Sequence, residues 1–210
     1  MGSPGAKEWS DTTRDRRRDT TPDLDTIIDT AARLFHDRGY QNTTMQDLAG
    51  ALGIAKPTLY SYIRSKSNIL GRIFDRVLTE ADALTGAAGN IEDPIEGLRH
   101  VITGMVHLSV TYRAHLGLFN GDLRELPANL RGRYRRGSVR FVESIQELVD
   151  RGQRAGRIRQ DLDSIVVAYA VVGMTNWGIR WLGARGPLPV SNAAEQLVTI
   201  VLAGVVEDPG

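Results

Sequence analysis

The chain has 210 residues, and its 41% hydrophobic and 24% charged content is that of a globular protein, which excludes bulk disorder. It contains no cysteine, which excludes disulfides, thiol catalysis and thiolate metal sites. Its 26 basic and 25 acidic residues nearly cancel, so any nucleic-acid site must be a local concentration of donor side chains.

Residues 1–20 are polar and end in a basic cluster that includes Arg16, Arg17 and Arg18. They contain no apolar stretch of the signal-peptide kind, and we expect a cytoplasmic protein. Short charge runs are most often solvated tails, which is the default interpretation of this segment. The alternative is a flexible arm that reaches DNA phosphates or the minor groove.

A first helix is expected to begin at Thr21 and Pro22, as cap and first helical residue, and to end at Gly39. Its apolar side chains recur at helical spacing and predict one buried stripe, made of Leu24, Ile27, Ile28, Ala31, Leu34 and Phe35. We expect Phe35 to pack against the two helices that follow rather than to contact a ligand.

Residues 43–70 predict two short helices joined by a tight turn and followed by a longer helix. Thr44 is a suitable cap with Asp47 three residues on, so the first short helix begins one residue after Thr44. Gly53 ends it, because glycine most readily takes the left-handed conformation just past a helix end. Pro57 suits the first turn of the second helix. This is the layout of a helix-turn-helix.

The second short helix, expected over residues 57–63, presents hydrogen-bond donors and no acid. Its exposed side chains are Lys56, Thr58, Tyr60, Ser61 and Tyr62. Donors at a helix N-terminus suit phosphate oxygens and base edges, whereas carboxylates would repel DNA. Ser65 then caps the longer helix, with Lys66 in its first turn. An ordinary helical hairpin with a solvated polar face has the same spacing, and the pattern alone leaves this alternative open.

Residues 22–75 closely resemble the DNA-binding region of the TetR family of transcriptional regulators. The matching residues are Gly39, Tyr40, Thr43, Thr44, Asp47, Leu48, Ala49, Gly53, Ile54, Lys56, Leu59, Tyr60 and Lys66. The resemblance implies DNA contacts from Thr43, Thr44, Lys56, Pro57, Thr58, Tyr60, Tyr62 and Lys66. Among these, Lys56, Pro57, Thr58 and Tyr60 match recognition-helix positions. Two departures from the family pattern, Ala55 and Ile63, remove a cap and change a core residue without deleting a DNA contact.

The rest of the chain predicts further helices. The helix that starts at Ser65 is expected to end near Thr85, before a break of small residues at 86–90. Five more helices are expected over residues 93–109, 112–126, 127–156, 161–182 and 192–206.

The segment 161–182 is the most apolar, but Asp163, Asn176 and Arg180 interrupt it, so we expect a buried helix and no membrane span. A helix that is apolar on all sides must be covered by its own domain and by a partner chain. The last helix adds a second apolar face, on which we expect Val201 to be exposed. These two helices predict a homodimer with a four-helix interface around a twofold axis.

The C-terminal half is also similar to regulators of fatty-acid and steroid catabolism that respond to acyl-coenzyme A thioesters. The similarity lies in Leu118-Phe119, the run 174–177, Arg180-Trp181 and the run 186–188. It suggests an apolar cavity with a polar end that includes arginine side chains. The expected lining residues are Met105, His115, Phe119, Phe141, Tyr169, Asn176 and Trp177. Core packing explains the same aromatic residues and remains an open alternative.

The chain is therefore expected to be all-α, with nine helices and no strand. By the resemblance, residues 1–20 form a basic arm, 21–68 a three-helix helix-turn-helix DNA-binding domain, and 69–210 a larger ligand-binding and dimerisation domain. The expected function is a repressor that binds a palindromic operator as a homodimer. An apolar, acidic small molecule, with acyl-CoA thioesters as candidates, is expected to release it.

Other classes of function find less support in the sequence. There is no glycine-rich phosphate loop, no HExxH motif and no serine elbow, so we do not expect an enzyme. His100 and His107 are too far apart for a helical metal pair, and we expect no metal or other cofactor. The alternatives are an architectural DNA-binding protein without an effector, whose C-terminal core would be filled, and an enzyme with an unrecognised site.

Overall fold

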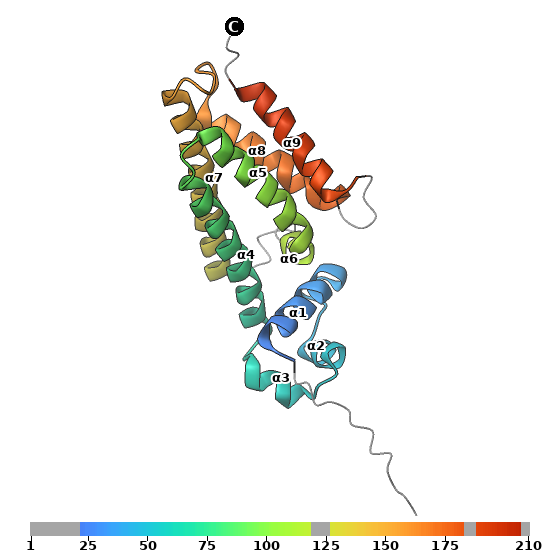
Figure 1. The fold of residues 1–210 in the computed structure, drawn as a ribbon. Coiled ribbons are helices and arrows are strands. Elements are labelled where there is room, and N and C mark those ends of the chain that lie inside the picture. The colour runs from blue at the N-terminus through green and yellow to red at the C-terminus, as the bar shows by residue number, and fades with distance from the viewer. Residues whose placement is uncertain (1–21, 119–126, 183–187, 207–210) are drawn as a thin grey trace, which may run out of the picture.

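The computed structural model describes residues 22–118, 127–182 and 188–206. Within these residues the chain forms nine α-helices and no strand beyond an isolated antiparallel bridge between Ile158 and Val206. Figure 1 shows an elongated molecule with α1–α3 at one end and the C-terminal helices at the other. The all-α prediction is confirmed for the described part of the chain.

The first three helices and the start of the fourth share one hydrophobic core. They are α1 (Leu24–Arg38), α2 (Met45–Leu52), α3 (Lys56–Tyr62) and α4 (Lys66–Gly89). Phe35 is buried in this core, as the sequence predicts. The start of α1 differs from the prediction, because Asp23 is the cap and accepts a 2.7 Å hydrogen bond from the Thr26 amide. The predicted cap, Thr21, lies outside the described residues.

Helix α4 links the two halves of the molecule (Figure 1). Its N-terminal residues Ile69 and Phe74 belong to the core of the first three helices, whereas Ala88 belongs to the core of the C-terminal helices. The predicted break at residues 86–90 starts too early, because α4 continues through Gly89 and is capped by Asn90. The predicted domain boundary between residues 68 and 69 falls inside this continuous helix, so one rigid element reaches both cores.

The C-terminal half consists of α5 (Pro94–Thr111), α6 (Arg113–Gly117), α7 (Ala128–Arg154), α8 (Ser164–Trp181) and α9 (Val190–Val205). Helices α4 and α7 lie side by side and run in the same direction. The ion pairs Arg133–Asp75 and Arg140–Asp82 join them seven residues apart on each helix. Of the helix predicted over residues 112–126, the described part contains only α6, with residues 119–126 outside the description.

No helix among the described residues is both long and apolar enough to cross a membrane. Helices α8 and α9 nevertheless expose large apolar side chains, with Val166 63%, Trp177 60% and Ile200 59% accessible. The prediction that Val201 is exposed is wrong, since only 8% of it is accessible. The exposed position on α9 is its neighbour Ile200, because Val201 faces the core shared with α5.

Candidate DNA-binding surface and effector cavity

A capping box fixes the start of α2. The Asp47 amide donates to the Thr44 hydroxyl at 3.1 Å, and the Thr44 amide donates to the Asp47 carboxylate at 2.8 Å. The Thr44 hydroxyl also donates to the Asp47 carboxylate at 2.6 Å. The hydrogen bonds from the Thr44 hydroxyl and amide hold the pKa of Asp47 below its ordinary value, because they stabilise the ionised carboxylate. At the other end, Gly53 has φ 67°, and the amide of Ile54 donates to the Ala49 carbonyl at 3.0 Å. The turn is therefore held from both sides.

Helix α3 lies at the end of the molecule opposite α9 (Figure 1). Tyr60 is 43% and Tyr62 38% accessible, and Lys56 and Pro57 are exposed, while Thr58 is half-buried. Leu59 and Ile63 are buried, so the opposite face of α3 anchors it to the core. Helix α3 carries no acid, which leaves these donors able to face a negative polymer.

Two residues of the predicted DNA-binding set have other roles. The side chain of Thr43 is fully buried and its hydroxyl donates to the Gly39 carbonyl at 3.0 Å, so its predicted DNA contact finds no support in this structure. The Lys66 ammonium donates to the carbonyls of Tyr40 at 2.7 Å and Gln41 at 3.3 Å, and lies 4.4 Å from the centre of the Tyr40 ring. Lys66 thus ties α4 to the loop before α2, and we now expect this structural role in place of the DNA contact that the resemblance implied.

A cavity of about 230 Å³ lies between α4, α5, α7 and α8. Four of the predicted lining residues do line it, namely Met105, Phe141, Tyr169 and Asn176. The predicted Trp177 is not among the described lining residues, and its side chain is exposed on α8. His115 is buried but faces α1, and Phe119 lies outside the described residues.

The acidic group at the polar end of the cavity was not anticipated from the sequence. Glu80 of α4 lines it, and the Tyr112 hydroxyl donates to the Glu80 carboxylate at 3.1 Å. No arginine or lysine is among the described lining residues, so the predicted arginine side chains find no counterpart in this part of the chain. Tyr112 and Glu80 are 32 positions apart in the chain, whereas helical spacing relates only side chains within about one or two turns. The sequence pattern therefore does not predict this pair.

The same tyrosine also contacts the side chains that join the two halves of the molecule. The Arg76 guanidinium lies 5.5 Å from the Tyr112 ring and 3.3 Å from the carboxylate of Asp29 on α1. His115 of α6 places its Nε2 atom 3.2 Å from the same carboxylate. Burial keeps the pKa of His115 below its ordinary value despite the attraction of Asp29, so the imidazole is neutral near pH 7.

A capped helix-turn-helix with an acid-free second helix, joined by one continuous helix to a second helical domain with a cavity, defines a ligand-responsive DNA-binding regulator. Family comparisons agree, since residues 27–73 match "Bacterial regulatory proteins, tetR family" and residues 92–205 match "Tetracyclin repressor-like, C-terminal domain". The chain belongs to the TetR family of bacterial transcriptional regulators. Its family and relatives are regulators, not enzymes.

Individual relatives extend this result over most of the chain. The HTH-type transcriptional repressor KstR2 of Mycolicibacterium smegmatis is 28% identical over 196 residues, which are 89% of this chain and 92% of that protein. The structure of the ketosteroid regulator KstR2 of Mycobacterium tuberculosis superposes with a TM-score of 0.80 at 22% identity, covering 87% of this chain and 94% of that one, which shows the shared fold. The crystal structure of AibR with isovaleryl coenzyme A and operator DNA has a TM-score of 0.73 at 25% identity, covering 84% and 96%.

Proposed function

We propose that the chain is a repressor that binds a near-palindromic operator as a homodimer and is released when an apolar small molecule occupies the cavity. The observation that carries this proposal is the position of Tyr112, which lines the cavity and also contacts Arg76, the partner of Asp29 on α1. The family supports the DNA-binding half of the proposal. The structure of AibR, which contains both an acyl-CoA and operator DNA, supports the effector half by analogy.

The route from cavity to DNA runs through side chains on three helices. A ligand that displaces Tyr112 disturbs its hydrogen bond to Glu80 and its contact with Arg76. Arg76 pairs with Asp29, and α1 packs against α2, so a shift of Arg76 moves the helix-turn-helix relative to the C-terminal domain. A movement that changes the separation of the two α3 helices of a dimer from about 34 Å disfavours their simultaneous contact with the two half-sites of the operator.

The size of the effect follows from linkage. A ligand changes operator affinity only to the extent that it binds the released state better than the DNA-bound state. Allosteric coupling is typically about 1–3 kcal/mol, which lowers operator affinity about 5- to 150-fold. This is sufficient to empty the operator when the repressor concentration is only moderately above the dissociation constant of the repressor–operator complex.

The exposed apolar surface of α8 and α9 supports the homodimer. Val166 and Trp177 on α8 and Ile200 on α9 are each more than half accessible. Large exposed apolar side chains on two adjacent helices favour burial against a second copy, and a twofold axis makes one patch self-complementary. A dimer also supplies the two recognition helices that a palindromic operator requires.

The cavity favours this function over the architectural alternative, which predicts a filled C-terminal core. It also corrects the expected effector, because an acidic group inside the cavity would meet the Glu80 carboxylate. The part of the effector that lies in the cavity is therefore apolar or hydrogen-bonding rather than anionic.

The decisive experiment uses the purified full chain and an operator selected from a random DNA pool. A metabolite panel that includes acyl-CoA thioesters is screened by thermal shift and then by operator release. We expect a compound that stabilises the protein and weakens operator binding about 5- to 150-fold. Arg76→Gln should reduce operator release more than it changes binding of that compound, because it breaks the ion pair with Asp29 on α1 and Arg76 is not itself a lining residue of the cavity.

Arg99→Gln is the matched control, since Arg99 is an exposed α5 residue paired only locally with Glu96 among the described residues. It should bind and release like the wild type. If a stabilising compound leaves operator affinity unchanged, the effector mechanism is wrong. A panel in which no compound binds would favour the architectural alternative.

A further inference from the structure

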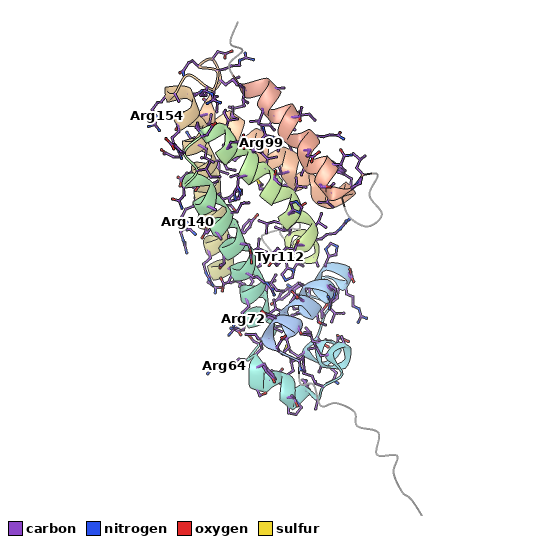
Figure 2. All side chains as sticks on the ribbon, viewed as in Figure 1. Arg64, Arg72, Arg99, Tyr112, Arg140 and Arg154 are labelled. Carbon is purple, nitrogen blue, oxygen red and sulfur yellow. The ribbon has the colours of Figure 1, made fainter. Side chains whose placement is uncertain are left out.

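Two hollows on the outer side of the α4/α7 pair form one arginine groove. Their volumes are about 630 and 370 Å³, and both are lined by Asp75 and Arg133. Figure 2 shows Arg64, Arg72 and Arg140 along the same edge of the molecule. The charged residues of the groove are Arg64, Arg72, Arg133, Arg136 and Arg140, with Asp75 and Asp82. Five guanidinium groups face two carboxylates, so the groove has an excess of positive charge.

The arginines of the groove differ in how they are paired. Arg133 pairs with Asp75, and Arg140 lies 3.4 Å from Asp82. Within the described residues, Arg136 has no ion-pair or hydrogen-bond partner, although it is exposed beside these pairs. An unpaired guanidinium presents a planar set of donors that matches a phosphate group.

Leu78 separates the arginine groove from the cavity. Its side chain lines both the 370 Å³ hollow of the groove and the cavity. On the α7 side it packs onto Gly137, where an added Cβ would lie 2.4 Å from Leu78 Cδ2. The absence of a side chain at Gly137 therefore makes room for Leu78 between the two helices. A rotamer change of this one side chain would join the apolar cavity to the charged groove.

The cavity and groove have complementary chemistry. At about 230 Å³ the cavity is smaller than the roughly 300–1,000 Å³ of pockets that enclose drug-sized ligands. Its only ionisable acid or base among the described lining residues, apart from tyrosines, is Glu80. An anionic part of an effector therefore has no partner inside, whereas arginines lie just beyond Leu78.

We propose that the effector is an amphipathic, phosphate-bearing molecule whose apolar chain enters the cavity past Leu78 and whose phosphates bind the arginine groove between α4 and α7. An acyl-CoA thioester divides in this way into an apolar acyl chain and a phosphorylated head group. This inference rests on the proposed function, in which the cavity binds the effector. A head group in the groove competes with Asp75 and Asp82 for the arginines of α7, and so loosens the ion pairs that join α7 to α4.

The test separates the phosphates from the acyl chain. Binding is measured by calorimetry for butyryl-, hexanoyl- and octanoyl-CoA, and for the matching N-acetylcysteamine thioesters, which have the same chain without phosphates. We expect at least one acyl-CoA to bind more tightly than its phosphate-free counterpart. Arg136→Gln should weaken the binding of that acyl-CoA about tenfold, which corresponds to one charge-assisted hydrogen bond of about 1.4 kcal/mol. The same substitution should leave the binding of the phosphate-free thioester unchanged.

Two further variants sharpen the result. Arg154→Gln removes a charge from the same helix outside the groove and should change neither affinity. Leu78→Ala should accelerate association of the acyl-CoA, because it opens the passage between groove and cavity. Arg136→Gln is expected to unfold at the wild-type temperature, since it breaks no ion pair among the described residues.

Several outcomes would overturn the proposal. It fails if the phosphate-free thioesters bind as tightly as the acyl-CoAs, or if Arg136→Gln binds them like the wild type. It also fails if Arg136→Gln weakens operator binding alone, because the groove would then be a DNA contact. Release of the operator by a phosphate-free compound, with no binding of any acyl-CoA, rejects the groove but keeps the proposed function. If no compound binds and none releases the operator, both proposals fail.

Discussion

The role of Lys66 leads to a prediction that separates a structural contact from a DNA contact. Its ammonium group donates to the Tyr40 and Gln41 carbonyls and lies over the Tyr40 ring, which ties the start of α4 to the loop before α2. Lys66→Ala removes all three interactions and leaves two carbonyls without their ammonium donor. We therefore expect this variant to lose stability.

The magnitude follows from the geometry. A hydrogen bond to a charged donor contributes about 1.5–3 kcal/mol, and a cation–π contact at an exposed site about 0.5–1 kcal/mol. Lys66 is half-buried and water replaces part of these interactions, so we expect a loss of about 2 kcal/mol in the free energy of unfolding. For a chain of this length, that lowers the melting temperature by about 4–8 °C.

Two measurements distinguish the roles. Thermal unfolding reports stability, and the salt dependence of operator binding reports phosphate contacts, since each contact contributes about 0.9 to the slope of log K against log salt. We expect Lys66→Ala to melt earlier while its salt slope stays unchanged. Lys56→Ala is the stability control, because Lys56 is exposed and such substitutions usually change stability by less than about 0.5 kcal/mol. A Lys66→Ala variant with normal stability and a slope reduced by about 0.9 would refute this reasoning.

Three further predictions concern the turn, the domain junction and the dimer. Gly53→Ala should lower the free energy of unfolding by about 1–2 kcal/mol in chemical denaturation, because the φ of Gly53 is +67°. Gly50→Ala, in the open interior of α2, should raise it by about 0.5–1 kcal/mol, and equal effects of the two substitutions would contradict this. Because burial lowers the pKa of His115, the unfolded state binds its proton more readily; stability is therefore full above about pH 6.5 and falls as pH drops towards the folded pKa. Urea unfolding between pH 7.5 and 5.5 should show this loss, and His115→Gln should reduce it. Ile200→Glu should convert a sedimenting dimer to a monomer while Thr199→Glu leaves it intact, and a dimeric Ile200→Glu would exclude α9 from the interface.

The helix-turn-helix could be derived from the sequence because its signals are local. The Thr44 and Asp47 capping box, the left-handed Gly53 and Pro57 in the first turn of α3 all lie where the sequence predicts. Each signal involves groups within about four residues of one another, a range in which the backbone geometry of a helix fixes the distances. The order and number of helices in the described part follow from the same short-range rules.

Helical periodicity also identified apolar faces, but not what each face contacts. Met105, Phe141, Tyr169 and Asn176 line the cavity as expected, because four apolar helix faces converge there. Trp177 was assigned to the same cavity and is exposed instead. A periodic pattern gives the angular position of a side chain on its own helix, while its neighbours depend on how that helix is rotated against the others.

The tertiary structure alone decided the contacts between distant segments. Lys66 binds carbonyls 25 and 26 residues away, Tyr112 binds Glu80 32 residues away, and Arg76 reaches Asp29 47 residues away. No spacing rule predicts such pairs, because their distances depend on the packing of whole helices around two cores. The sequence by itself therefore determined which helices form and which of them carries exposed donor side chains without an acid. Packing determined which side chains lie between the cavity and α1.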